Sequence, residues 1–321
     1  MLKFIIRRIG LLLLTIFIAS LLIFIIAQVI PGDICRVILG REAGEEALKT
    51  CRIELGFITN SGEPISSINR YVHWVSNFAK GNWGISFATG ENINSWVLGR
   101  LNNSLMLAGV VLIISIPLAV LLGILAGLNE GKWIDAVISI GSLSVVGLPE
   151  FVTGILLINL VAFHSKIIPA TSSIPIGTPF LAALPSLILP AITASLVLVA
   201  YIARLTRAGI IQELKQNYVR TADLKGIRRS TVLFKHVLRN SLMPTITVIG
   251  ISIGWLISGL VVVENVFNYP GLGRLMIFAI DRRDLPTLQA CVMVSVLVFS
   301  LANLFADLIY ALLDPRIKLR K

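Results

Sequence analysis

Long, uninterrupted apolar runs constrain this chain more than any other feature of its sequence. A helix needs about 20 consecutive apolar residues to cross the hydrocarbon core of a bilayer, and each run reaches that length. Leu, Ile, Val and Ala fill the runs without the alternation of apolar and polar residues that membrane β-strands show. The runs therefore predict an all-α, polytopic membrane protein. The six predicted transmembrane helices are residues 9–30, 104–128, 136–163, 184–203, 243–263 and 288–313.

The composition excludes a soluble enzyme. Hydrophobic residues make up 56% of the 321 residues and charged residues only 14%, whereas a soluble domain has about 25% charged residues. A net charge of +11 would suggest nucleic acid as a partner in a soluble chain. Membrane proteins, however, collect Lys and Arg in their cytoplasmic loops. We therefore predict a lipid membrane as the surroundings and no nucleic acid as a partner.

The distribution of charge predicts which loops face the cytoplasm. Residues 204–242 contain nine Lys or Arg and two acids, and residues 314–321 contain four and one. Residues 31–103 contain seven of each. The positive-inside rule places the first two segments in the cytoplasm and the third outside.

The first apolar run predicts a retained anchor, because it exceeds the apolar region of about 7–15 residues in a cleaved signal peptide. Six spans then give an N-in, C-in topology. The chain divides into a cytoplasmic tip with the first transmembrane helix (1–30), an extracytoplasmic loop region (31–103) and a five-helix core (104–321), which includes the cytoplasmic loop 204–242.

The cytoplasmic loop is too long for a simple turn. The helical spacing of Tyr218 and Ala222 predicts a helix that stops at Gly226, and Ser230 or Thr231 offers the N-cap of a second helix. Taken alone, these residues also suit an amphipathic helix that lies on anionic lipid headgroups.

The loop reads YVRTADLKG at 218–226, then a basic helix and LRNSLMP at 238–244. It resembles the cytoplasmic signature loop of ABC importer permeases, in the subclass that serves peptides, nickel and related substrates. The general family pattern is Glu-Ala-Ala, three residues, then Gly. Here the corresponding positions are Arg220, Thr221 and Ala222, followed by Gly226, which is similar to the peptide subclass.

Further blocks resemble the same subclass, in the same order along almost the whole chain. They are PGD at 31–33, KGNWGIS at 80–86, VVENVFNYPGLGRL at 262–275, RRDLP at 282–286 and DPRI at 314–317.

The resemblance implies a permease subunit in the bacterial inner membrane that forms half of a translocation pore. Its expected partners are a second homologous permease, two cytoplasmic ATPases and an extracytoplasmic binding protein that delivers peptides or related small solutes. In that family the signature loop couples to the ATPase. The coupling residues expected here are Tyr218, Val219, Arg220, Thr221, Ala222, Leu224, Lys225 and Gly226, with Tyr218, Val219 and Leu224 as apolar anchors.

The sequence has no G-x-x-x-x-G-K-[ST] phosphate-binding loop. We therefore expect a non-catalytic subunit that binds no cofactor, with ATP and Mg on the separate ATPases. The three Cys and three His are scattered, so we also expect no metal site.

Glu150 is a carboxylate at predicted membrane depth, where ionisable residues face a cavity or a partner. It is either a pore-lining group that meets a substrate amine or a structural group beside the Pro149 kink. An ion-coupled secondary transporter that uses Glu150 is the alternative function.

Two further sets of residues lie in the predicted extracytoplasmic part. The run from Glu264 through Tyr269, Pro270 and Gly271 contains a compact Pro-Gly turn, for which the resemblance suggests an external gate and the plain alternative is loop closure. Cys35 and Cys51 share the first outer loop, so they form either a disulfide in an oxidising compartment or two free thiols.

Overall fold

The computed structural model describes residues 2–29, 34–40, 42–54, 56–164, 168–175 and 177–313. Within these ranges every regular element is a helix, and two isolated β-bridges are the only extended pairing. The predicted all-α class is therefore confirmed. The motifs at 31–33 and 314–317 and the basic segment 314–321 lie outside the described residues.

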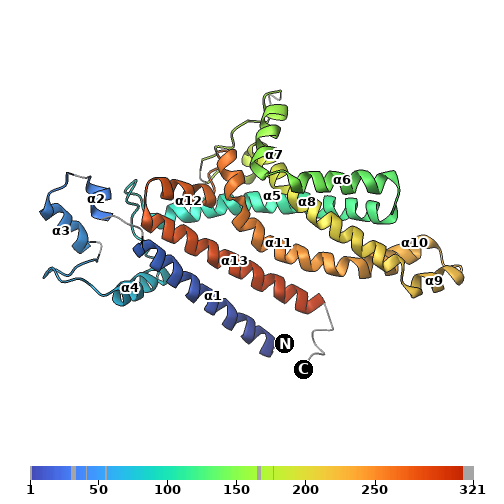
Figure 1. The fold of residues 1–321 in the computed structure, drawn as a ribbon, viewed down its shortest axis with the longest axis horizontal. Helices are drawn as coiled ribbons and strands as arrows, with labels where there is room; N and C mark the ends of the chain where they lie inside the picture. The colour runs from blue at the N-terminus through green and yellow to red at the C-terminus, as the bar shows by residue number, and fades with distance from the viewer. Residues whose placement is uncertain are drawn as a thin grey trace.

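Long helices carry the apolar runs, and short helices lie in the loops between them (Figure 1). In chain order the helices are α1 (Leu2–Val29), α2 (Ile34–Leu39), α3 (Glu45–Glu54), α4 (Ser67–Ala79), α5 (Ile93–Leu128), α6 (Trp133–Gly147), α7 (Glu150–Leu157), the π-helix η1 (Ile158–Ala162), α8 (Phe180–Leu214), α9 (Asn217–Leu224), α10 (Arg229–Val232), the π-helix η2 (Leu233–Val237), α11 (Leu238–Val266), α12 (Leu272–Asp281) and α13 (Leu285–Leu313).

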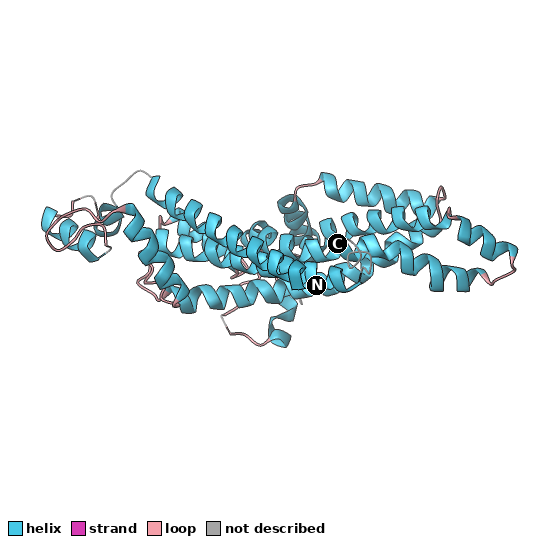
Figure 2. Ribbon diagram, turned by 90° about the horizontal axis from the view of Figure 1, so that it is seen from below, coloured by secondary structure: helices cyan, strands magenta, loops and turns pink. Residues whose placement is uncertain are grey.

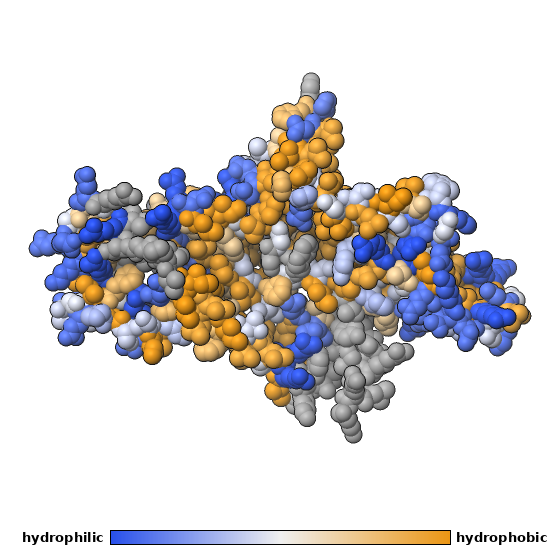
Figure 3. Space-filling view, viewed as in Figure 1, coloured by the Kyte–Doolittle hydropathy of each residue, from blue (hydrophilic) through white to orange (hydrophobic). Residues whose placement is uncertain are grey.

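Five helical stretches of the described chain are long and apolar enough to cross a membrane, and the bent pair of α6 with α7 and η1 makes a sixth if it is counted as one span. Figure 3 shows apolar side chains across the middle of the molecule and polar side chains toward both ends. This distribution is what a bilayer-spanning protein requires, because only the middle contacts hydrocarbon.

The span predicted over 136–163 is broken at the predicted Pro149 kink. Helix α6 ends at Gly147, α7 begins at Glu150, and the two axes are bent by 105°. Leu148 between them is extended, with ψ 131°, because a residue before proline is sterically excluded from the helical region. Pro149 also has no N–H to donate. The result is that α7 projects away from the bundle (Figure 1).

Helices α5 and α8 pack most closely in the centre of the bundle. A Cβ atom at Gly123 of α5 would lie 2.5 Å from Cβ of Thr206 and 2.7 Å from the carbonyl oxygen of Ala203, both on α8. Small residues allow this approach of two backbones, which dispersion then stabilises. The G-x-x-x-G spacing of Gly123 and Gly127 is the sequence signal for this approach, which the prediction of the spans does not include.

The anchor α1 lies beside α13 and runs antiparallel to it (Figures 1 and 2). Arg8 and Asp307 form an ion pair of 2.9 Å between the two helices. At the other end of α1, the hydroxyls of Ser20 and Tyr71 are hydrogen-bonded at 2.8 Å, which connects α1 to α4. Most apolar side chains of α1 remain exposed on this chain, as expected for a helix that faces lipid.

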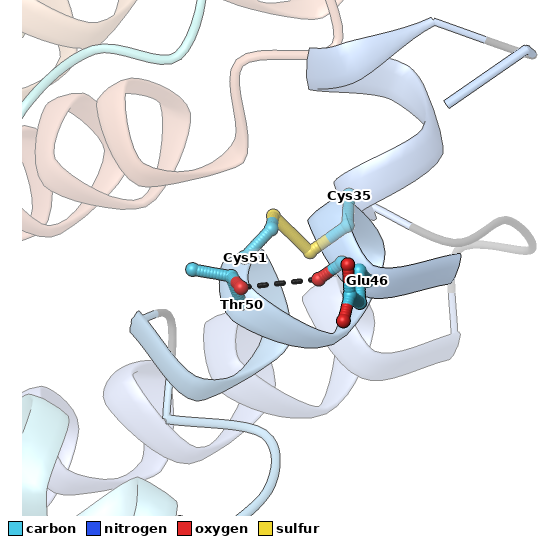
Figure 4. Close-up of a disulfide and its surroundings, with 4 residues drawn as sticks. All are labelled: Cys35, Glu46, Thr50 and Cys51. Atoms are coloured by element: carbon cyan, nitrogen blue, oxygen red, sulfur yellow. Dashed lines mark hydrogen bonds between the residues drawn. A yellow bond between two sulfur atoms is a disulfide. The ribbon is translucent and has the colours of Figure 1, made fainter. Parts of the chain in front are cut away.

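Helices α2 and α3 form a small lobe at one end of the molecule, which we call the disulfide lobe. Cys35 and Cys51 are bonded to each other across it (Figure 4). The disulfide packs against the buried side chain of Leu48, and Thr50 donates a hydrogen bond to the carbonyl oxygen of Glu46 at 3.0 Å. The covalent bond joins helices that are too short to bury a core of their own.

Two of the sequence blocks meet in space near this end. Asp284 is fully buried and accepts hydrogen bonds from the hydroxyls of Ser86 and Thr287 and from the backbone N–H of Phe87. Ser86 belongs to the block at 80–86 and Asp284 to the block at 282–286. The carboxylate therefore connects the chain before α5 to the start of α13.

We predict that the close approach at Gly123 tolerates no side chain. Gly123→Ala should lower the thermal unfolding temperature of the detergent-purified protein, with a cost of about 1–3 kcal/mol for overpacking. Gly109→Ala is the matched control, because Gly109 lies on the same helix and a Cβ there meets nothing within 4 Å. Equal unfolding temperatures for the two variants would contradict the packing.

Candidate functional site

The predicted coupling loop forms a hairpin that extends from one end of the bundle (Figures 1 and 2). Helix α8 continues to Leu214, α9 follows, and α10 with η2 leads back to α11. We call residues 217–237 the hairpin segment. The second helix begins at Arg229 with Arg228 as its N-cap, so the N-cap predicted at Ser230 or Thr231 is wrong. Both of those residues lie in the first turn instead.

Gly226 ends α9 as predicted. Its φ is +71°, a conformation that L side chains rarely adopt. The N–H of Ile227 donates to the carbonyl oxygen of Ala222 at 3.2 Å, and the N–H of Gly226 donates to that of Asp223 at 3.0 Å. This pair of bonds is a Schellman motif, which turns the chain sharply and satisfies the last carbonyls of the helix.

One face of the hairpin segment packs against the protein itself. Val219, Val232 and Val237 are buried together with Ile210 of α8. The hydroxyl of Tyr218 donates to a carboxylate oxygen of Glu213 at 2.7 Å.

Burial raises the pKa of the Tyr218 hydroxyl, and the hydrogen bond to Glu213 raises it further by a smaller amount. The sequence predicts Tyr218 and Val219 as anchors for a partner. For Val219 the prediction is wrong, because its side chain is buried within this chain. Tyr218 is only half-buried, so its contact with a partner stays a prediction. Ala222 is also half-buried and packs against the same cluster.

Other residues of the hairpin segment are exposed. Leu224 is 81% exposed and Phe234 is 74% exposed, and Arg220, Thr221 and Lys225 are exposed in the same segment. The hairpin segment thus exposes two large apolar side chains and several polar or basic ones. Phe234 was not among the residues selected from the sequence.

A partly buried ion pair lies close to the base of the hairpin, with Asp135 buried and the side chain of Arg207 31% exposed. Arg207 of α8 donates from Nε and from Nη2, the latter at 2.7 Å, to the two carboxylate oxygens of Asp135 at the start of α6. Asp135 also accepts from the N–H of Gly131 at 3.0 Å and from the hydroxyl of Ser139 at 3.2 Å. The pair fixes α6 to α8. No local pattern in the sequence pairs residues 72 positions apart.

Glu264 lies in a buried junction between α11, α12 and α5. Its side chain is 1% exposed, and its carboxylate accepts from the hydroxyl of Ser104 at 2.5 Å and from the N–H of Arg274 at 3.1 Å. The hydroxyl oxygen of Ser104 in turn accepts from the N–H of Leu272 at 2.8 Å. Glu264 thereby satisfies donors at the start of α12, where a carboxylate is favourable.

The other residues of the predicted gate belong to the same junction. Tyr269 is fully buried and donates from its hydroxyl to the carbonyl oxygen of Asn103 at 2.7 Å. The amide of Asn103 donates to the carbonyl oxygen of Pro270 at 3.0 Å. A Cβ at Gly271 would clash with the Glu264 carboxylate. These contacts favour loop closure, with no side chain of Glu264 or Tyr269 free to line a path in this conformation.

Glu150 is the first residue of α7, directly after the break in the bent pair. Its side chain is half-buried. Its backbone carbonyl accepts from the hydroxyl of Thr153 at 2.8 Å, but within the described ranges its carboxylate has no hydrogen-bond or ion-pair partner. The structure therefore gives no support to the structural pairing that we considered from the sequence.

Among the residues that the structure describes, no group of three or more His, Cys, Asp or Glu could hold a metal ion. The remaining thiol, Cys291, is buried in a cluster of apolar side chains.

Comparison with known proteins bears on the whole chain. Residues 119–319 match the family described as binding-protein-dependent transport system inner membrane component, and residues 1–108 match the N-terminal family of the same membrane component. A probable peptide ABC transporter permease of Sinorhizobium fredii is 35% identical over 315 residues, which cover 98% of this chain and 99% of that protein. The glutathione transport system permease of Escherichia coli is 32% identical over 318 residues, 99% of each chain.

These relatives are ABC permeases, which favours the importer over the ion-coupled alternative. They also confirm the resemblance drawn from the sequence blocks. The two family matches cover most of the chain, and the relatives align along nearly its full length. This chain therefore belongs to the family of binding-protein-dependent transport proteins, as a multi-pass permease component of an ABC importer in the inner membrane.

Proposed function

We propose that this chain forms half of the pore of an ATP-driven importer for peptides or related small solutes. A second homologous permease forms the other half, two cytoplasmic ATPases drive the cycle, and an extracytoplasmic binding protein delivers the solute. Relatives that transport peptides and glutathione support the solute class. The observation that carries the proposal is the exposure of Leu224 and Phe234 on the hairpin segment.

The proposed topology is N-in, C-in. The basic residues of 204–242 support it through the positive-inside rule. The disulfide lobe lies at the opposite end of the molecule from the hairpin segment (Figure 1). Disulfides persist in oxidising compartments outside the cytoplasm, so both ends favour the same orientation.

We infer that Leu224 and Phe234 insert into a cleft on an ATPase. Apolar side chains at the core of a protein interface lose their exposed area on binding, and aromatic residues are enriched there. Arg220 and Lys225 would contact carboxylates on the ATPase, and exposed ion pairs of this kind contribute about 0–1 kcal/mol each. The buried valines beneath, with the Schellman turn at Gly226, hold the docking face in one shape. Val219 and Tyr218 act as supports of that face.

The Asp135–Arg207 pair provides a route from the hairpin to the pore. Movement of α8 would be carried to α6 through this bidentate, partly buried contact, and α6 leads to the break before Glu150. Helices joined in this way move as rigid bodies when a domain closes. Glu150 would then line the pore, where its carboxylate can meet a solute amine. The buried junction of Glu264, Tyr269, Pro270 and Gly271 would hold the loop between α11 and α12 in place next to an extracytoplasmic gate.

ATP and Mg are expected on the ATPases and not on this chain. Purified alone, the protein should neither bind nor hydrolyse ATP, because no phosphate-binding loop is present in its sequence. Nucleotide binding by calorimetry and phosphate release by a coupled assay check this. ATP hydrolysis by a homogeneous preparation of this chain would contradict the assignment of ATP to separate ATPases.

The docking face can be tested without disturbing the fold, because its side chains are exposed. Leu224→Gln combined with Phe234→Gln should lower recovery of the ATPases on the tagged chain at least about tenfold, since burying a Leu contributes about 1.5–3 kcal/mol. Ile68→Gln on α4 is the control, because Ile68 is 75% exposed on the opposite side of the membrane. Undiminished recovery from native membranes in the double variant would reject this docking face.

The partly buried pair can be separated from an ordinary surface pair. Arg207→Gln leaves the buried Asp135 carboxylate without its cation, which should cost about 1–3 kcal/mol of stability. Lys215→Gln breaks the exposed pair with Glu130 and should cost no more than about 1 kcal/mol. Unfolding temperatures of the purified variants measure both.

The role of the pair in coupling needs a second measurement. The double variant Asp135→Asn with Arg207→Gln removes both charges and should regain part of the lost stability. Its ratio of solute imported to ATP hydrolysed should nevertheless stay below that of the unmodified complex. A stable double variant with an unchanged ratio would show that the pair is only structural.

A further inference from the structure

A half-open cavity of about 310 Å³ lies between the first turns of α5, the end of α11 and helix α12. Helix α12 lies toward the end of the bundle that carries the disulfide lobe (Figure 1). Trp96 and Arg100 of α5 face Arg274, Phe278 and Asp281 of α12 across it. The cavity has no part in the hairpin segment or in the bent pair.

The cavity carries two guanidinium groups and one carboxylate. Within the described ranges neither arginine forms an ion pair. Arg274 donates from Nη1 to the carbonyl oxygen of Asn268 at 3.0 Å, while Nε of Arg100 is buried without a hydrogen-bond partner in this part of the chain. A buried donor without a hydrogen-bond partner costs free energy. The position of this N–H in the wall of a cavity therefore points to a ligand that accepts a hydrogen bond from it.

The neighbouring buried carboxylate does not fill this requirement. Glu264 is not part of the cavity wall. Its oxygens already accept from the hydroxyl of Ser104 and from the backbone N–H of Arg274. Nε of Arg100 and the guanidinium nitrogens of Arg274 other than Nη1 therefore remain available, and the two arginines outnumber the single carboxylate of Asp281 in the wall.

The remaining wall is apolar and aromatic. The rings of Trp96 and Phe278 meet edge to face, with centroids 5.4 Å apart. A cavity of this size is at the lower end of the range for small-molecule sites, about 300–1,000 Å³, which combine apolar walls with a few placed polar groups. The site suits a small solute with one anionic end and a short apolar part.

We propose that this cavity is a subsite for the carboxylate of the transported solute. The planar guanidinium groups of Arg100 and Arg274 match a carboxylate in shape and charge, and Trp96 and Phe278 contact the adjoining side chain. The proposal rests on the proposed function as an importer of peptide-like solutes. It adds that the permease itself selects solutes with a free carboxyl end before they enter the pore.

The test uses the full complex of both permeases and the ATPases in nanodiscs, without the binding protein. The probes are dialanine and its C-terminal amide, which differ by the carboxylate, and binding is followed by saturation-transfer NMR. Dialanine should bind at least about tenfold more tightly than the amide, because hydrogen bonds between charged groups are the strong ones. Equal binding of the two probes overturns the proposal.

Variants assign the preference to the cavity. Arg100→Gln should abolish the preference for dialanine, and Arg100→Lys should keep part of it. Lys49→Gln, an exposed charge on the disulfide lobe, should leave it unchanged. An unaltered preference in Arg100→Gln overturns the proposal. If that variant fails to assemble, the Arg100→Lys variant and the comparison of the two probes on the unmodified complex still test whether the cavity prefers a carboxylate.

The same preparations separate this subsite from the importer itself. ATP-driven uptake of dialanine by the unmodified complex with its binding protein tests the proposed function. Absence of that uptake overturns the importer, whereas normal uptake without any carboxylate preference overturns the subsite alone. Weaker attachment of the binding protein to Arg100→Gln, with unchanged probe binding, also overturns the subsite and assigns the cavity to protein docking.

Discussion

Backbone N–H and C=O groups in the hydrocarbon core need partners within the protein, because each unsatisfied group costs several kcal/mol. That constraint makes the long elements of this chain helical and makes any break in them significant. The break at Leu148 and Pro149 interrupts the path of α6 into α7, and Leu148 is 43% exposed on the isolated chain. Irregular backbone at such depth requires covering protein or a water-filled path, and both are features of a pore shared between two subunits.

Buried carboxylates hold the ends of the helices together. Glu264 connects α11 to α12 and α5, Asp284 connects the start of α13 to the chain before α5, and Asp135 connects α6 to α8. Each is surrounded by donors from hydroxyls, backbone N–H groups or a guanidinium, which is the condition for burying a charge. The contacts of Glu264 and Asp284 lie toward the end of the bundle that carries the disulfide lobe, and those of Asp135 lie near the hairpin segment. Between them the bundle is packed mainly by apolar side chains.

The hairpin segment divides its side chains between a buried set and an exposed set, and we propose the exposed set as the contact with an ATPase. Val219, Val232 and Val237 face the protein and stiffen the segment, while Leu224 and Phe234 face away. A docking element that transmits force needs both properties, because a flexible segment would absorb the movement it receives. The polar sequence between these apolar positions keeps the tip outside the membrane.

The helical class, the spans with the kink at Pro149, the stop of α9 at Gly226 and the family could all be predicted from the sequence, because run length, proline and glycine preferences and ordered motifs are local properties of the chain. The sequence did not determine which side of α9 is buried, so Tyr218 and Leu224 looked equivalent. The Asp135–Arg207 pair, the Gly123 contact and the cavity of Arg100 and Arg274 were decided only by the tertiary structure. They join residues far apart in sequence, and the packing of whole helices brings those residues together.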